Sequence, residues 1–150
     1  MVNGFSLETA RERFMGPDSP NSQCRLPLLL DLSWRLTAEE AAILFIEQWS
    51  GCDDTWEYRS HVRELLREIR PPLPDWCQET ELTVFRGCSK GREDGLSRTT
   101  SHDIASEFAS GHRGIPVENP IVLQRTIQLT EVLFATNDRE EFEVIPDVPE

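Results

Sequence analysis

Residues 81–88, which read ELTVFRGC, decide the fold class of this chain, because a helical sequence gives way to strands here. Polar and apolar side chains alternate from Glu81 to Arg86, which is typical of a strand with one buried face. The prolines of Pro71-Pro72-Leu73-Pro74 stand just before this stretch. Proline lacks an amide donor and restricts the residue before it, so these residues end any preceding helix.

Two helices are predicted on the N-terminal side of the prolines. Thr37-Ala38-Glu39-Glu40 has the form of a capping box, and a largely apolar run to Trp49 follows it. A second helix is expected to begin near Asp53 or Asp54. Its apolar residues recur at the spacing of an amphipathic helix: Tyr58, Val62, Leu65, Leu66 and Ile69. Residues 1–25 mix charge, proline and serine, so we expect a loosely ordered arm with one short helix at Leu7–Phe14.

Strands and one helix are predicted after the first strand. Leu96–Thr100 is a short β-prone run, and Thr100 or Ser101 then caps a helix that buries Ile104, Ala105, Phe108 and Ala109. Further strands are expected at Ile121–Leu129 and Phe142–Ile145. Helices first and strands later favour an α+β fold over a doubly wound sheet. We therefore expect a single domain over residues 26–150, with a helical part at 37–70 and a β-rich core at 80–146.

Composition and charge exclude several classes of function. The 150 residues carry a net charge of −12, which argues against binding nucleic acid by general neutralisation of phosphates. The sequence shows no apolar run of membrane-spanning length and no secretory signal at its start, so a soluble, cytoplasmic protein is expected. The four cysteines have no CxxC spacing and no histidine at a zinc-ligand spacing, so free thiols and no metal site are expected.

Arg86 and Gly87 allow two interpretations. The commoner one is an exposed strand end followed by a turn. In the other, Arg86 binds a phosphate and Gly87 keeps the backbone clear for the ligand. The segment from Arg86 to Thr100 holds four cations and two anions in an acidic protein, which favours a small anionic ligand. Its glycines match neither a P-loop nor a dinucleotide fingerprint.

Two further groups of residues are candidates for a site. Ser97, Thr99 and Thr100 form a hydroxyl cluster at the head of a predicted helix, where they either bind a ribose or phosphate or simply cap the helix. Glu141 and Glu143 are two apart at the start of a strand, so period-two geometry predicts both carboxylates on one face. They either stabilise a cation or protect an edge strand with charge.

The stretches VFRGC, GLSRTTSHDIASEFA and NDREEFEVI, in this order, resemble the ADP-ribosyltransferase fold family of the arginine, serine, glutamate class. The resemblance covers about residues 80 to 146. It implies a split, curved pair of β-sheets that binds NAD as a substrate, with helices added at the N-terminus. The position after Ser97 holds Arg98, where many members of the family have an aromatic residue. Phe108 or Phe134 is therefore expected to flank the nicotinamide ring.

The same resemblance implies roles for single residues. Arg86 anchors the NAD phosphate or ribose, and Ser97 orients the catalytic carboxylate. Glu143 stabilises the oxocarbenium ion as nicotinamide leaves, and Glu141 positions or deprotonates the acceptor. Gly87, Thr99, Thr100 and Phe108 are placed in the NAD site with them.

The expected function is mono-ADP-ribosyl transfer to a macromolecule or NAD hydrolysis. A protein arginine is the first acceptor to test, because the first acid of Glu-x-Glu can hold a guanidinium. A non-catalytic acidic binding or inhibitor protein on the same scaffold stays open. A phosphate-transfer enzyme of this fold is a weaker alternative, because no histidine stands at the matching strand position.

Overall fold

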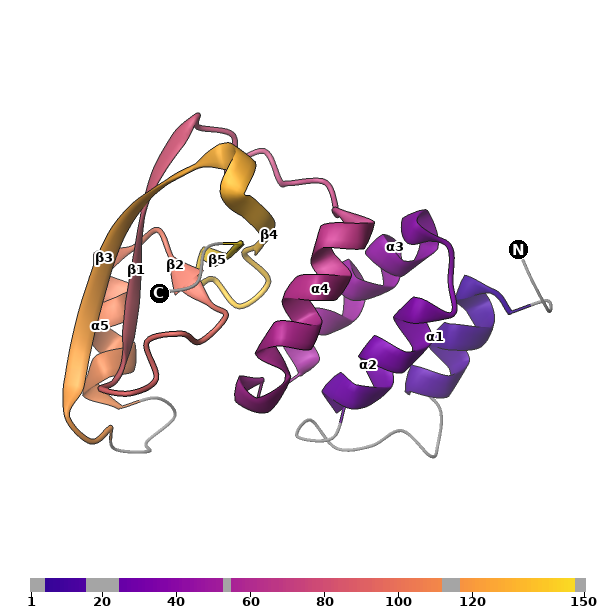
Figure 1. Cartoon of the computed structure of the whole chain (residues 1–150), viewed down its shortest axis with the longest axis horizontal. Helices are drawn as coiled ribbons and strands as arrows, with labels where there is room; N and C mark the ends of the chain where they lie inside the picture. Colours follow the sequence, from indigo (N-terminus) through magenta and orange to yellow (C-terminus); the bar gives the residue numbers. More distant parts are fainter. Residues whose placement is uncertain (1–4, 16–24, 53–54, 112–116, 148–150) are drawn as a thin grey trace. The chain divides into compact units, whose positions relative to one another are not determined.

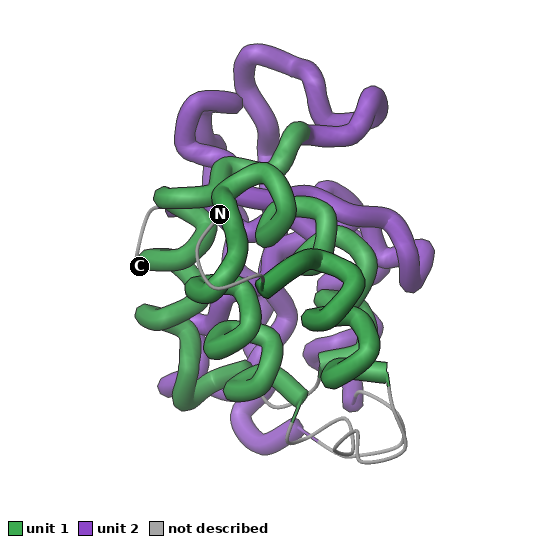
Figure 2. Tube along the Cα trace, turned by 90° about the vertical axis from the view of Figure 1, so that its right-hand side faces the viewer, with its two compact units in different colours: residues 1–72 green, residues 73–150 purple. Residues whose placement is uncertain are grey.

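The computed structural model describes residues 5–15, 25–52, 55–111 and 117–147 of the chain. These residues form two compact units, Met1–Pro72 and Leu73–Glu150, each traced in its own colour in Figure 2. The boundary falls within the proline-rich segment that separates the helical part from the β-rich part in the sequence. The single domain that we expected from residue 26 is therefore divided between these two parts.

The first unit is helical (Figure 1). It contains α1 (Leu7–Met15), α2 (Arg25–Trp34), α3 (Ala38–Gln48) and α4 (Arg59–Ile69), with single 3₁₀ turns at Trp49–Gly51 and Trp56–Tyr58. Each α-helix buries apolar side chains completely, and these include Phe14, Leu29, Phe45 and Leu65. Helix α2 was not predicted, because its sequence RLPLLLDLSW carries a proline and lacks a clear polar stripe.

The capping box predicted at Thr37 is confirmed. The Thr37 hydroxyl accepts a hydrogen bond from the Glu40 amide at 3.2 Å, and the Thr37 amide donates to Glu40 Oε1 at 3.4 Å. The hydroxyl of Thr37 also lowers the pKa of Glu40 from its ordinary value, as does its amide. The second predicted helix is confirmed as α4, although its proposed start at Asp53 or Asp54 lies outside the described residues. It ends at Ile69, and the next residue, Arg70, has a φ of 40°.

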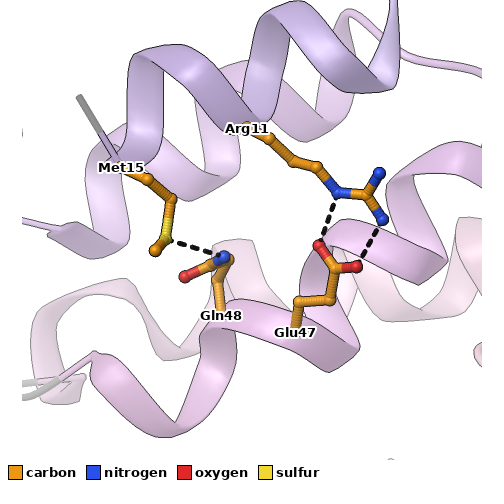
Figure 3. Close-up of polar contacts among 4 residues, drawn as sticks. All are labelled: Arg11, Met15, Glu47 and Gln48. Atoms are coloured by element: carbon orange, nitrogen blue, oxygen red, sulfur yellow. Dashed lines mark hydrogen bonds and ion pairs between the residues drawn. The ribbon is translucent and has the colours of Figure 1, made fainter.

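Residues 7–15, which were expected to belong to a loosely ordered arm, form α1 and pack within the helical unit. Ala10 and Phe14 of α1 are fully buried. Figure 3 shows how the polar side of α1 meets α3: Arg11 Nε donates to Glu47 Oε1 at 2.9 Å, and Gln48 Nε2 donates to Met15 Sδ at 3.2 Å. The prediction of a helix at Leu7–Phe14 is thus confirmed, and that of a loose arm is wrong for these residues.

The second unit is an antiparallel sheet with one helix (Figure 1). Its strands are β1 (Glu81–Ser89), β2 (Arg98–Thr99), β3 (Pro120–Gln128), β4 (Val132–Thr136) and β5 (Glu143–Pro146), in the order β3-β1-β2-β5-β4. Helix α5 (His102–Ser110) follows β2, and a 3₁₀ turn at Leu129–Glu131 precedes β4. The predicted α+β class is confirmed.

Two strand pairs of this sheet, β1–β3 and β4–β5, are joined by the very short strand β2. Strands β1 and β3 pair along nine residues of each, from Glu81↔Gln128 to Ser89↔Pro120. On the other side, β4 pairs with β5. Only β2 connects them, through Phe85↔Thr99 to β1 and through Arg98↔Val144 and Thr99↔Glu143 to β5. Phe85, Thr99 and Glu143 therefore lie in one row across three strands.

The two faces of the sheet are covered differently. One face carries the apolar core, which consists of Cys77, Leu82, Val84, Ile127, Val132, Ala135 and Val144, with Leu73, Trp76 and Leu129 packed at its edge. Helix α5 covers β1 and β3 on the other face (Figure 1). Strand β4 was not predicted, because Val132, Leu133, Phe134 and Ala135 are all buried and the sequence shows no alternation.

Among the described residues, no helix combines the length and the apolar composition that crossing a bilayer requires.

Candidate functional site

Ser97 is the residue at which the three predicted segments meet. Its hydroxyl donates a hydrogen bond to Glu143 Oε2, and its carbonyl accepts one from Arg86 Nη1 at 2.9 Å. Arg86 comes from β1, Ser97 stands one residue before β2, and Glu143 begins β5. Residues separated by 46 positions in the sequence are thus in direct contact.

The sheet register explains the contact between Ser97 and Glu143. Thr99 lies opposite Glu143 in the β2–β5 pair. Side chains two residues apart on an extended chain point to the same face, so Ser97 directs its hydroxyl to the side on which Glu143 lies. Arg86 is one residue out of the row formed by Phe85, Thr99 and Glu143, so its side chain leaves β1 on the other face. Arg86 and Glu143 therefore approach Ser97 from different sides.

The guanidinium of Arg86 is held by backbone carbonyls of the segment that connects β1 and β2. Nε donates to the carbonyl of Arg92 at 3.0 Å, in addition to the bond from Nη1 to Ser97. Desolvation lowers the pKa of Arg86 from its ordinary value, and attraction to Cys88 and Asp94 partly opposes this effect. A cation that has lost part of its hydration gains more from an anionic ligand than an exposed one does. Because Arg86 and Glu143 leave the sheet on different sides, the register counts against a groove that this guanidinium and Glu143 both face.

Gly87 has a different role from the one expected. A Cβ at this position would lie 1.8 Å from the carbonyl oxygen of Ala105 and 2.8 Å from the amide nitrogen of Ala109. Both atoms belong to the backbone of α5. The missing side chain therefore makes room for the helix, and the explanation that it clears space for a ligand is wrong.

The hydroxyl cluster mainly organises the turn before β5 and the start of α5. Thr99 is buried, and its hydroxyl donates to the carbonyl of Glu141 at 2.7 Å and accepts from the amide of Ser101 at 3.1 Å. The amide of Thr100 donates to the carbonyl of Phe142 at 3.3 Å. Ser101 caps α5, because its hydroxyl accepts from the amide of Ile104. The sequence left Thr100 and Ser101 as alternative N-caps of this helix, and the N-cap is Ser101.

The turn between β4 and β5 adopts an uncommon backbone conformation. Glu140 and Phe142 have φ values of 57° and 46°, in the left-handed region that residues other than glycine rarely enter. The side chain of Asn137 stabilises this turn by accepting from the amide of Phe142 at 2.9 Å. Because Phe142 is not extended, period-two geometry does not relate Glu141 to Glu143. The argument that placed both carboxylates on one face is therefore wrong.

A pocket of about 350 Å³ opens between α5 and this turn. Helix α5 contributes Phe108 and Glu107, among others, and the turn contributes Arg139, Glu140 and Glu141. Three carboxylates and one guanidinium give the lining an excess of negative charge. Such a pocket suits a cationic group, and Phe108 adds an aromatic surface to it.

The aromatic residues near the site differ from those expected. Phe134 is 1% exposed, so the prediction that it could flank a ligand is wrong, and Phe108 lines the pocket. Phe142 was missed: it is 37% exposed and contacts Trp76 edge to face, with ring centroids 5.4 Å apart. Its position between two acids in Glu141-Phe142-Glu143 was the available signal.

Among the described residues, Cys52, Cys77 and Cys88 are buried and are not joined by disulfide bonds, and Cys24 lies outside these residues. Burial raises the pKa of the Cys88 thiol, although attraction to Arg86 opposes the shift. Among the described residues, no three side chains of His, Cys, Asp or Glu are grouped as metal ligands. His61 and His102 are exposed.

Comparison with known proteins gives no match to this chain, whether the search is made against family models, curated proteins or solved structures.

Proposed function

We propose that this protein is an NAD-dependent mono-ADP-ribosyltransferase or NAD glycohydrolase. The observation that carries the proposal is the contact of Ser97 with both Arg86 and Glu143. The three residues come from three different parts of the chain, in the order arginine, serine, glutamate. This is the order and the convergence that the resemblance to the ADP-ribosyltransferase family implies.

The shape of the sheet gives further support. In that family a split pair of curved sheets holds NAD. Here the five strands form one sheet, in which β1 and β3 pair along nine residues and β4 and β5 through four residue pairs, and the two-residue strand β2 joins the two pairs.

Glu143 is assigned the central chemical role. Cleavage of the bond between nicotinamide and ribose develops positive charge on the ribose, and a fixed carboxylate stabilises that charge more in the transition state than in the ground state. Ser97 keeps the carboxylate in one orientation through its hydroxyl. Nicotinamide leaves from a cationic pyridinium and needs no proton from an acid. Arg86 binds the pyrophosphate of NAD as a guanidinium.

The acceptor is assigned to the pocket beside α5. Glu107, Glu140 and Glu141 line it together, so it favours a cationic side chain. A guanidinium forms two parallel hydrogen bonds to a carboxylate, which makes a protein arginine the preferred acceptor. In this assignment Glu141 positions the arginine for attack on the ribose carbon that nicotinamide has left.

Mass spectrometry of cell proteins incubated with this protein and NAD tests activity and acceptor class together. The expected result is an added ADP-ribose mass on arginine residues. The Glu143→Gln variant serves as the matched control, since it keeps a side chain of the same size and should give no adduct. Free nicotinamide without any adduct would indicate a glycohydrolase, and neither product would refute the proposal.

A second candidate is a binding or inhibitor protein that uses the same fold without turnover. It is favoured by the net charge of −12, which suits a basic partner. Such a partner would bind equally well after Arg86 and Glu143 are replaced together. Weakened binding in that double variant, or binding that does not respond to added salt, would count against this candidate.

A further inference from the structure

Gly95 stands where the backbone passes the guanidinium of Arg86, and no turn requires glycine there. The glycines of the described residues that have a positive φ are Gly91 and Gly111, so Gly95 adopts a conformation open to alanine. The reason for glycine at this position must therefore be space.

The space is filled by the guanidinium. A Cβ at Gly95 would lie 2.0 Å from Nη2, 2.3 Å from Cζ and 2.8 Å from Nη1 of Arg86. All three distances are shorter than van der Waals contact. A single methyl group would therefore displace the charged end of Arg86 from its present position.

The backbone around Gly95 is buried and hydrogen-bonded, whereas the guanidinium is the end of a flexible side chain, so the guanidinium is the group that moves. Gly95 is itself buried, and the next residue, Leu96, is only 2% exposed. The amide of Gly95 donates to the carbonyl of Arg92 at 3.2 Å, and the amide of Arg92 donates to the carbonyl of Ser89 at 2.9 Å. The carbonyl of Arg92 also accepts a hydrogen bond from Arg86 Nε, so the same carbonyl binds both the backbone of Gly95 and the side chain of Arg86.

We infer that Gly95 is a positioning residue: it sets the place of the Arg86 guanidinium and, through it, the binding of the NAD pyrophosphate. The effect on binding of the NAD pyrophosphate rests on the proposed function. The effect of Gly95 on the position of the Arg86 guanidinium does not, and it can be tested without NAD.

The NAD-independent test is an NMR measurement of the Arg86 side chain. Its Nε–H group bonds the carbonyl of Arg92, so it should give a ¹⁵N–¹H signal protected from solvent exchange. The signal is assigned by its loss in Arg86→Lys. We expect it to shift and to lose protection in Gly95→Ala. An unchanged, protected signal in that variant would overturn the inference.

Gly91→Ala is the matched control in the same segment. A Cβ there meets nothing within 4 Å, although the φ of 102° strains an alanine. The added methyl group does not reach Arg86, so this variant tests strain in the turn without a direct clash with the guanidinium. It should leave the Nε–H signal protected, and equal loss of protection in both variants would show a general loosening and contradict a specific role for Gly95.

The functional test is a double-mutant cycle on NAD turnover. Gly95→Ala should raise KM for NAD at least about tenfold with a smaller change in kcat, because a lost phosphate contact weakens binding. In the Arg86→Ala background the same change should have no further effect. An additive effect, or an unchanged KM in Gly95→Ala, would overturn the positioning role. An inactive wild-type protein would instead refute the proposed function and leave the NMR result to decide the first half.

Discussion

At the scale of the residue, Ser97 contacts Glu143 through its side chain and Arg86 through its backbone. Its hydroxyl bonds the carboxylate of Glu143, while its backbone carbonyl bonds Arg86. A substitution of the side chain therefore removes only the first of these contacts. This makes Ser97 the position at which the orientation of Glu143 can be changed while Arg86 keeps its partner.

Replacing Ser97 by alanine should lower kcat for nicotinamide release roughly ten- to a hundredfold. This is the range expected from the loss of one hydrogen bond to a charged group. KM for NAD should change less, because the contact of Arg86 with the carbonyl remains. Steady-state kinetics measure both values.

Ser101→Ala is a useful control for Ser97→Ala, since it removes a hydroxyl that caps α5 instead. It should lower stability by about 1 kcal/mol and leave kcat nearly unchanged. A loss of kcat in Ser101→Ala as large as in Ser97→Ala would show that fold disturbance accounts for both.

The role of Gly87 could not be predicted from the sequence. A glycine after an arginine fits ligand clearance and helix packing equally well, because both need the same absent side chain. The register of β1 against α5 decides between them, and that register depends on residues distant in the chain. The same is true of Gly95, which the sequence presents only as part of a turn.

At the scale of the element, the close contact between α5 and β1 depends on small residues on both sides. Gly87 of β1 meets the backbone of α5 at Ala105 and Ala109, and both alanines are buried. Because the obstructing atoms are backbone atoms, a larger residue cannot be accommodated by a change of rotamer. The helix would have to move away from the sheet.

Gly87→Ala should therefore destabilise the protein by about 3 kcal/mol, at the upper end of the cost of overpacking. For a chain of this size the Tm should fall by roughly 6 to 12 °C. Thermal unfolding followed by circular dichroism measures the change. Thr83→Ala, at an exposed position of the same strand, should shift the Tm by no more than about 2 °C. Equal shifts in the two variants would contradict the packing account.

Elements with a strong local signal were predictable, and those defined by burial alone were not. The capping box at Thr37 and the alternation from Glu81 to Arg86 led to α3 and β1. Strand β4 has four buried residues in succession, so periodicity could not distinguish it from a helix. The positive φ at Phe142 is set by the side chain of Asn137 and the turn around it, which no alternation rule includes.

At the scale of the whole molecule, the candidate site belongs entirely to the second unit. Arg86, Ser97 and Glu143 all lie within residues 73–150, as does the acidic pocket. The sequence singled out these three residues, but it did not show that Arg86 and Glu143 contact Ser97 from different sides of the sheet. The contact depends on β2, a strand of two residues that joins β1 to β5. So short a strand gives little sequence signal of its pairing.

The most direct test of this account is the rate at which the protein releases nicotinamide from labelled NAD, compared between the wild type and Glu143→Gln. The account predicts release by the wild type and a rate lower by on the order of a hundredfold or more in the variant, because a fixed carboxylate no longer stabilises the ribose cation. Equal rates in the two proteins, or no release by a correctly folded wild type, would contradict it.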